Sequence, residues 1–276
     1  MSYKKILTIQ DISCVGQCSL TVALPILSAC GMETCILPSA ILSTHTAGFS
    51  GYTVRDLTDD MPAICDHWVK ENIKFDAIYT GYLGSTKQID YVKDIIARTK
   101  KADAVTVIDP AMADGGKLYP AFDSEYVNAM KTLCSNADIL LPNLTEACFL
   151  TDKEYKESYD SEYIEDILVS LEAMGAKTIV LTGISYNEGK TGVIVRENGK
   201  TDYYEHEKIA KGSHGTGDVY ASAFTGALLN GKSVYDSAKI AADYTVECIL
   251  ATQNDPEHWY GVKFEAVIDK LINLLK

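Results

Sequence analysis

The sequence lacks several features that would place it in a class at once. No apolar run approaches the ~18 residues of a membrane-spanning helix, and the eight cysteines include no C-x-x-C pair. There is no internal repeat, low-complexity tract or long Gly/Ser linker. Lys and Arg are in the minority, 25 against 38 Asp and Glu, so the net charge is −13. Because nucleic-acid binding rests on clustered Lys and Arg, we expect a protein that binds neither membrane nor nucleic acid.

The remaining composition is that of a globular protein. Of the 276 residues, 47% are hydrophobic and 23% are charged. The apolar run at residues 6–9 stops at Asp11, which is too short for a signal peptide. A chain of this length builds a core without disulfides, so we expect reduced, mostly buried thiols and a cytoplasmic location. We expect one domain spanning residues 1–276.

Short β-branched runs alternate with segments of helical spacing. Several runs are continuously apolar, as expected of strands covered on both faces. The alternation predicts an α/β fold with three layers, a central mostly parallel sheet with helices on both faces. The predicted strands are residues 5–10, 34–38, 76–80, 105–109, 138–142 and 178–182, followed by a hairpin at 192–195 and 202–205; the predicted helices are 20–30, 86–100, 162–174, 215–229, 234–250 and 264–275.

Residues 215–218 (GTGD) open one of these helices. In such a sheet, ligands bind beyond the carboxyl ends of the strands. Glycines let the backbone approach a ligand, and a helix N-terminus attracts an anion. An ionised Asp218 beside that anion could accept a proton from an attacking hydroxyl. Thr216 or Asp218 is also an ordinary helix cap, so this alternative stays open.

Acidic residues follow two further strands. Asp109 ends the run at 105–109, and Glu146 lies in the first turn of a helix that begins after Asn143. Oxygen ligands from separate strand ends suit Mg²⁺, which keeps several waters and bridges to phosphates. Acidic first turns are also common helix electrostatics, so Glu146 alone does not decide the matter.

Two nucleotide-binding motifs are excluded. Residues 183–191 resemble a P-loop, but they have five residues between the glycines instead of four. A strand follows where that motif needs a helix. No G-x-G-x-x-G follows the first strand, where Gly16 stands alone, which argues against a dinucleotide-dependent dehydrogenase. Lys117 and Lys211 are available to assist an anion, although solvated lysines are the ordinary interpretation.

The N-terminal third offers hydrogen-bonding groups and aromatic faces. Asp11 and Ser13 follow the first strand, and Tyr82 follows the third. Residues 43–52 are polar, aromatic and punctuated by glycine, which suits a mobile flap or a binding loop. Together with His45 in that loop, these groups suit the lining of a site for a small heteroaromatic ligand better than one for a sugar.

Together these segments resemble the ribokinase-like superfamily and, within it, the pyridoxal (vitamin B6) kinases. The resemblance runs from the first strand to about residue 250. It rests on residues 10–13, 43–51, 81–83, 109–112, 143–146 and 215–218. It implies a ribokinase-like fold, ATP as co-substrate, and phosphorylation of the 5′-hydroxymethyl group of pyridoxal, pyridoxine or pyridoxamine. It also implies Mg²⁺ and a homodimer, and it leaves open whether K⁺ takes part.

The resemblance assigns roles residue by residue. Asp218 matches the catalytic base, and the residues of its anion hole are Gly215, Thr216 and Gly217. The substrate side comprises Asp11, Ser13, His45, Thr46, Tyr82 and Asp218. The ATP side comprises Asp109, Asn143, Glu146, Thr182, Gly183, Gly215 and Gly217, of which Asp109 and Glu146 would serve the metal.

Two departures leave the preferred vitamer open. Pyridoxal kinases usually carry Ser where this chain has Asp11, and the turn after Thr46 is one residue longer than usual. Relatives that phosphorylate hydroxymethylpyrimidine share the stretch at 214–217, and many have Cys in place of Asp218. They are the principal alternative, with a sugar kinase as a further one. A non-catalytic nucleotide sensor would lack Asp218 or the motif at 143–146, and both are present.

Overall fold

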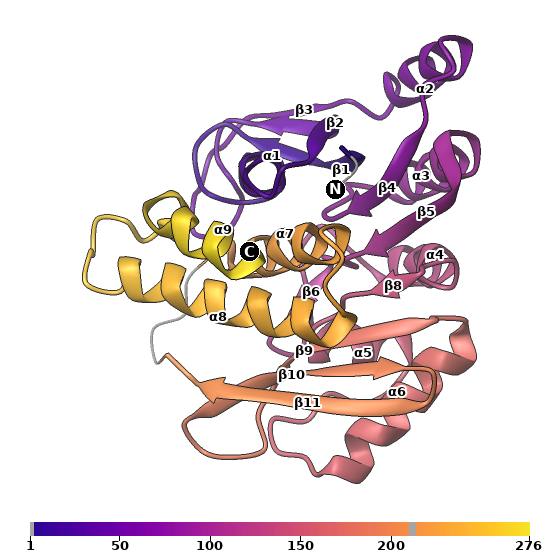
Figure 1. Ribbon diagram of the computed structural model, residues 1–276. Coiled ribbons are helices and arrows are strands. Elements are labelled where there is room, and N and C mark those ends of the chain that lie inside the picture. The colour runs from indigo at the N-terminus through magenta and orange to yellow at the C-terminus, as the bar shows by residue number, and fades with distance from the viewer. Residues whose placement is uncertain (1–2, 210–213) are drawn as a thin grey trace.

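The computed structural model describes residues 3–209 and 214–276, and its centre is a sheet (Figure 1). Within these residues the strands are β1 (Lys5–Ser13), β2 (Glu33–Leu42), β3 (Val54–Asp56), β4 (Phe75–Thr80), β5 (Lys100–Ile108), β6 (Ala113–Asp114), β7 (Lys117–Leu118), β8 (Ile139–Leu140), β9 (Thr178–Ile184), β10 (Lys190–Glu197) and β11 (Lys200–Glu207). In this part of the chain, nine of them form one sheet in the order β11-β10-β9-β8-β5-β4-β1-β2-β3. The six from β9 to β2 run parallel, and β3, β10 and β11 are antiparallel to their neighbours.

Helices cover both faces of this sheet (Figure 1). In the described residues they are α1 (Leu20–Ala29), α2 (Met61–Lys70), α3 (Thr86–Thr99), α4 (Ser124–Cys134), α5 (Leu144–Leu150), α6 (Ser161–Met174), α7 (Thr216–Leu229), α8 (Val234–Thr252), the 3₁₀ turn η1 (Phe264–Val267) and α9 (Ile268–Leu275). One apolar core joins the sheet to α2–α6, and the other joins it to α1, α7, α8 and α9. Adjacent side chains of β1 point to opposite faces, Ile6 into the second core and Leu7 into the first.

The predicted architecture is confirmed, with differences at particular elements. The hairpin β10–β11 follows β9 directly, so residues 183–191 are not a P-loop. β5 begins at Lys100, whereas the predicted strand begins at residue 105. The sequence pattern misses the first residues because residues 101–103 are exposed and carry no apolar pattern. No periodic apolar pattern predicts α2, in which only Met61 and Cys65 are buried. α4 and the short strands β3, β6 and β7 were likewise not predicted.

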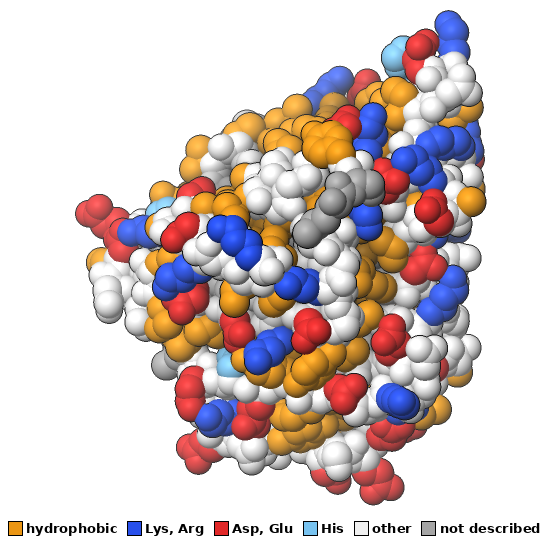
Figure 2. Space-filling view, viewed as in Figure 1, with side chains coloured by type: hydrophobic (Ala, Val, Ile, Leu, Met, Phe, Trp, Pro, Cys, Tyr) orange, Lys and Arg blue, Asp and Glu red, His pale blue; other side chains and the backbone are white. Residues whose placement is uncertain are grey.

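The thiols and charges agree with the expectations from composition. All eight cysteines are free, and Cys30, Cys65, Cys134, Cys148 and Cys248 are buried. On the face shown in Figure 2, Lys and Arg side chains lie scattered among Asp and Glu. No helix within residues 3–209 and 214–276 has both the length and the apolar character needed to cross a membrane.

Candidate active site

The carboxyl ends of the parallel strands meet at one edge of the sheet, because these strands share one direction. Most of the predicted site residues lie at this edge. Asn143 and Thr182 are neighbours there, joined by an isolated parallel bridge. The other strand-end positions at this edge are Asp11 and Ser13 in β1, Tyr82 after β4 and Asp109 directly after β5.

Asp11 lies near the end of β1, where the pairing of this strand with β2 is irregular. Gln10 pairs with Pro38 but Ile12 pairs with Ile41, so the extra residue of this β-bulge belongs to β2. Asp11 is only 5% exposed, and Ser13 Oγ donates a hydrogen bond to its Oδ2 at 3.2 Å. Burial raises the pKa of Asp11, while hydrogen bonds from the Ser19 and Ser13 hydroxyls oppose the rise.

Glu146 is held rigidly at the start of α5 by backbone groups. It forms a capping box with Asn143, whose Oδ1 accepts from the Glu146 N–H at 2.9 Å. In return, Glu146 Oε2 accepts from the Asn143 N–H at 2.8 Å, and Oε1 accepts from the Met112 N–H at 3.1 Å. Each carboxylate oxygen therefore already has a backbone donor. This arrangement suits contact with a metal through a water molecule.

Asp109 interacts with the carboxyl groups of both Glu146 and Asp218. Burial raises the pKa of Asp109, and the nearby Asp218 carboxyl raises it further. Burial is also the largest cause of the raised pKa of Glu146, and the Asp109 carboxyl is the next. No Lys or Arg in the described part of the chain is among the groups that shift the pKa of Asp109 or Asp218. A cluster with this surplus of carboxyl groups favours a bound cation.

The donor set fits Mg²⁺ only if other ligands complete it. Among residues 3–209 and 214–276, no group of three or more His, Cys, Asp or Glu side chains could hold a metal ion. Mg²⁺ commonly binds through one or two carboxylates and takes its remaining ligands from water and substrate phosphates. Asp109 and Glu146 match that pattern. They do not match a site in which protein side chains alone bind the metal.

The start of α7 is built to admit a ligand. Gly215 precedes the helix with a φ of 74°, and a Cβ added there would lie 1.9 Å from the Gln17 carbonyl oxygen. Only glycine fits that position. Gly217 is exposed, and a Cβ added to it would meet nothing within 4 Å. Because the first turn of a helix directs backbone N–H groups outward, this open mouth, with Thr216 between the glycines, suits an anion.

Asp218 lies in the first turn of α7 and is partly buried. Burial raises the pKa of Asp218 to about 7, Asp11 adds to the rise, and a hydrogen bond from the Ser19 N–H opposes it. A carboxyl group that titrates near neutral pH is suited to general base catalysis. Within the described residues, no side-chain hydrogen bond caps α7, whose capping position is Gly215, so neither Thr216 nor Asp218 occupies that position.

Ser19 joins the two acids and was not found from the sequence. Its hydroxyl is a hydrogen-bond partner of Asp11, and its backbone N–H is one of Asp218. The residue has a φ of 55°, a left-handed value that is rare outside glycine. It precedes α1 but makes no side-chain capping bond. A serine before a helix predicts only a cap, so no sequence signal pointed to this role.

The predicted substrate-binding residues lie around Asp11. Both His45 and Tyr82 lie close enough to Asp11 for electrostatic interaction. Burial raises the pKa of Tyr82 to about 12, so its hydroxyl stays protonated, and its ring lies 5.3 Å from that of Phe122. Thr46 is exposed on the loop at 43–52. His45 is 4% exposed, and both of its ring nitrogens have partners within the protein.

Tyr119 is a second residue that sequence reasoning missed. Burial raises its pKa, and Glu146 and Asp109 are the next largest causes, which places its hydroxyl beside the acid cluster. With 17 tyrosines in the chain, nothing in the sequence singled it out. Lys117 is exposed in β7, and Lys211 lies outside the described residues.

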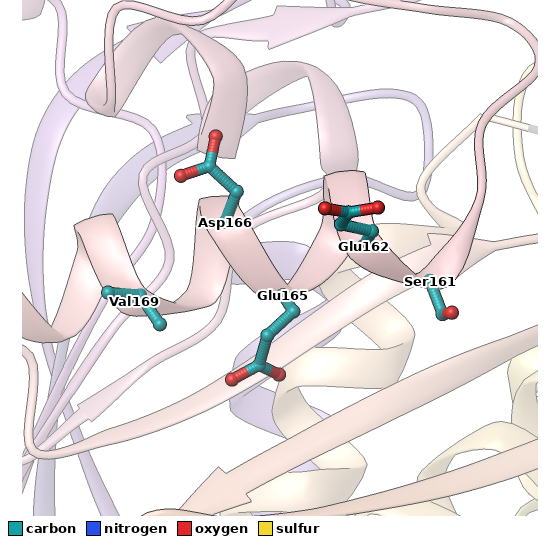
Figure 3. A pocket seen from close by; sticks show the side chains of 5 residues that line it. All are labelled: Ser161, Glu162, Glu165, Asp166 and Val169. Atoms are coloured by element: carbon teal, nitrogen blue, oxygen red, sulfur yellow. The ribbon is translucent and has the colours of Figure 1, made fainter.

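A hollow on the outside of α6 does not compete with this site. Its lining residues in Figure 3 are Ser161, Glu162, Glu165, Asp166 and Val169. Three of the five carry carboxylates, which would repel a phosphorylated ligand. Glu165 pairs with Arg196 at 2.9 Å, and Asp166 pairs with Lys153, so two of these charges already have partners.

Comparison with known proteins identifies the family of this chain. The sequence profile of the phosphomethylpyrimidine kinase family matches residues 24–262. Pyridoxal kinase of Dictyostelium discoideum is 27% identical over 239 residues, which cover 80% of this chain and 77% of that protein. A Bacteroides thetaiotaomicron structure, assigned as a phosphomethylpyrimidine kinase and crystallised with pyridoxal, is 36% identical, with a TM-score of 0.92 over 98% of this chain and 96% of that one. Pyridoxal kinase from Lactobacillus plantarum is 31% identical, with a TM-score of 0.91 over 99% and 98%. The chain therefore belongs to the family of kinases that includes the phosphomethylpyrimidine and pyridoxal kinases, and it has their ribokinase-like fold.

Proposed function

We propose that this protein is a pyridoxal kinase, which transfers the terminal phosphoryl group of ATP to the 5′-hydroxymethyl group of a B6 vitamer. One observation carries the proposal: Asp218, with a pKa of about 7, stands at the open N-terminus of α7. A proton acceptor beside an anion-binding helix start suits a reaction in which an alcohol attacks a phosphate. The relative crystallised with pyridoxal supports the choice of substrate.

In the proposed reaction, Asp218 accepts the proton of the substrate hydroxyl as its oxygen attacks the γ-phosphorus in line. The new O–P bond forms as the bond from that phosphorus to the β,γ-bridging oxygen breaks, and ADP leaves. The first turn of α7, at Gly215, Thr216 and Gly217, holds the oxygens of the transferring group. Most of the rate in phosphoryl transfer comes from such positioning and charge stabilisation.

Asp109 and Glu146 would hold Mg²⁺ in this scheme, Glu146 through water. When bound, the ion offsets the negative charge of the triphosphate and of the carboxyl groups around it. The backbone dipoles at the start of α7 add a second local positive field. A protein with a net charge of −13 can thereby bind ATP without a basic surface.

The nucleotide side of the proposed site is built from Asn143, Thr182 and Gly183. The Thr182 N–H donates to the carbonyl oxygen of Pro142 at 2.9 Å, which fixes β9 beside the start of α5. Gly183 is exposed with a φ of 75°, and a Cβ added to it would meet nothing within 4 Å. That opening leaves room for the adenosine of the nucleotide.

Asp11, Ser13, Thr46 and Tyr82 would surround the vitamer ring. The buried Asp11 carboxyl and the Ser13 hydroxyl supply polar partners, and Tyr82 supplies an aromatic face. Thr46 adds an exposed hydroxyl from the loop at 43–52. Since Asp11 stands where pyridoxal kinases usually carry serine, we expect this position to influence which vitamer is preferred.

We also propose that the protein is a cytoplasmic homodimer. Eight free thiols suit a reducing compartment. Edge strand β3 and its neighbour β2 expose apolar side chains, Val54 at 56% and Ile41 at 39%, which a second copy could cover. Sedimentation velocity at micromolar concentration tests the dimer, and a single monomeric species would contradict it.

The family profile also supports a second candidate, a hydroxymethylpyrimidine (phosphate) kinase. An ATP-consumption assay with pyridoxal, pyridoxine, pyridoxamine, hydroxymethylpyrimidine and ribose decides between them. We expect turnover with at least one B6 vitamer at a kcat/KM above that for the pyrimidine. A higher kcat/KM for hydroxymethylpyrimidine would transfer the assignment to the second candidate, and turnover with ribose alone would exclude both.

A further inference from the structure

Three segments far apart in the sequence are joined beside Asp11. They are residues 14–19 after β1, residues 43–52 between β2 and β3, and residues 253–263 between α8 and η1. Backbone hydrogen bonds join the first two, from Val15 N–H to Ser43 O at 3.2 Å and from His45 N–H to Val15 O at 3.3 Å. The third segment belongs to none of the motifs that define the proposed site.

Both ring nitrogens of His45 are engaged by backbone groups. Its Nδ1 accepts from the Ala47 N–H at 3.1 Å, so Nδ1 carries no proton. Its Nε2 lies 2.6 Å from the carbonyl oxygen of Tyr260, which can only accept, so Nε2 carries the proton and donates. The ring is therefore a neutral imidazole in one defined tautomer. No nitrogen remains to bind a substrate.

Gly16 and Phe49 lie close to the His45 ring on two sides. A Cβ added to Gly16, whose φ is 106°, would lie 2.2 Å from His45 Cδ2. On another side, the Phe49 ring lies 5.0 Å from that of His45 and 4.6 Å from that of Trp259. Aromatic contacts thus tie the loop at 43–52 to the segment at 253–263 a second time.

Gln17 extends the connection to the phosphate side of the site. Its Nε2 donates to the Glu265 carboxylate at 2.8 and 2.9 Å, and its Oε1 accepts from His258 Nε2 at 2.8 Å. The Gln17 carbonyl oxygen packs against Gly215, the residue that opens α7. The segment at 253–263 therefore contacts the loop around the substrate directly and reaches Gly215, at the anion-binding turn, through Gln17.

We propose that His45 is a positioning residue and that the Tyr260 carbonyl is its anchor, so that residues 253–263 hold the loop at 43–52 over the substrate. The inference rests on the proposed function for the identity of that substrate. His45 acts through the loop, which carries Thr46, and does not itself hydrogen-bond the vitamer. Losing the anchor should weaken substrate binding more than turnover.

Two conservative variants separate the two hydrogen bonds of His45. In His45→Gln the side-chain amide can still donate to Tyr260, whereas in His45→Asn the shorter side chain can still accept from Ala47. We expect His45→Ala and His45→Asn to raise KM for the vitamer by about tenfold to a hundredfold, the scale of a misplaced binding group. In these two variants kcat should change by less than about threefold. His45→Gln should have a KM for the vitamer close to that of the wild type. His67→Ala, which alters an exposed histidine in α2, is the control.

Two further readouts need no substrate, so they test the anchor even if the vitamer assignment fails. Trp68→Phe leaves Trp259 as the only tryptophan. In that background, His45→Ala should shift the Trp259 emission and speed amide hydrogen exchange in residues 43–52, and His45→Gln should do neither. Unchanged exchange and emission in His45→Ala would overturn the proposal. So would a fall in kcat with KM unchanged, which would place His45 in the chemical step.

Discussion

Replacing Asp218 with asparagine tests the proposed base and its electrostatic setting together. Asparagine has nearly the same shape but cannot accept the proton of the attacking hydroxyl. We expect Asp218→Asn to lower kcat by about 10²- to 10⁴-fold, the usual contribution of a general base, with KM for ATP little changed. In the wild type, kcat should rise with pH and level off above about 7, because burial raises the pKa of Asp218 to about 7.

The same pKa shift predicts an opposite effect on stability. Asp218 keeps its proton up to about pH 7 in the folded protein, but loses it near 3.8 when unfolded. The folded state binds more protons between these values, so ionisation of Asp218 lowers the free energy of unfolding as pH rises from 3.8 to 7. At about 1.36 kcal/mol for each pKa unit, the difference between 3.8 and about 7 corresponds to about 4 kcal/mol. Asp218→Asn should therefore be more stable than the wild type at pH 8, by up to that amount.

Two measurements check this reasoning. Steady-state ATP consumption between pH 5 and 9 gives kcat, and urea unfolding at pH 8 and pH 4 gives the free energies. The stability gain should disappear at pH 4, where the wild-type residue is protonated in the folded state. Asp103→Asn, which alters an exposed acid in β5, is the matched control. Near-normal turnover by Asp218→Asn would remove this residue from the role of base, and equal stability at pH 8 would refute the raised pKa.

Four other variants test separate parts of the structure. Gly217→Ala should fold normally, because its Cβ meets open space, and it should raise KM for ATP. Gly215→Ala should lower the melting temperature, because alanine would have to adopt a φ of 74° and its Cβ would collide with the backbone. Equal melting temperatures of the two variants would contradict this. Glu146→Gln should raise the Mg²⁺ concentration for half-maximal activity, and an unchanged metal titration would place the metal elsewhere. Burial opposes ionisation of Asp138, but two lysines outweigh it and lower its pKa to about 2. Asp138→Asn should lose about 2 kcal/mol of unfolding free energy at pH 7, and urea unfolding should show the loss fading as pH falls from 3.8 through about 2.

Local sequence patterns predicted the parts of the site that are themselves local. The apolar runs that form β1, β4, β5 and β9 end in polar residues, so their shared edge followed from the alternation of strands and helices. The capping box of Glu146 lies within four residues, and the glycines before Asp218 mark a helix start. In each case the chemistry and its structural support lie in one short segment.

The supports that the sequence did not reveal are contacts between distant segments. Ser19 reaches Asp218 across almost 200 residues, and nothing near Ser19 indicates a φ of 55°. His45 was expected to contact the substrate, yet its hydrogen bonds go to backbone groups at 47 and 260. α2 escaped prediction because only two of its side chains are buried, too few to make a periodic pattern.

The anchor of His45 also has a consequence for the order in which the protein is made. Tyr260 lies 215 residues further along the chain, so the loop at 43–52 leaves the ribosome long before its partner exists. A nascent chain ending at Thr252 already contains every strand of the central sheet, yet it lacks the carbonyl that fixes His45. During synthesis, the vitamin-binding end of the enzyme is therefore completed late, after most of the scaffold that carries it can form.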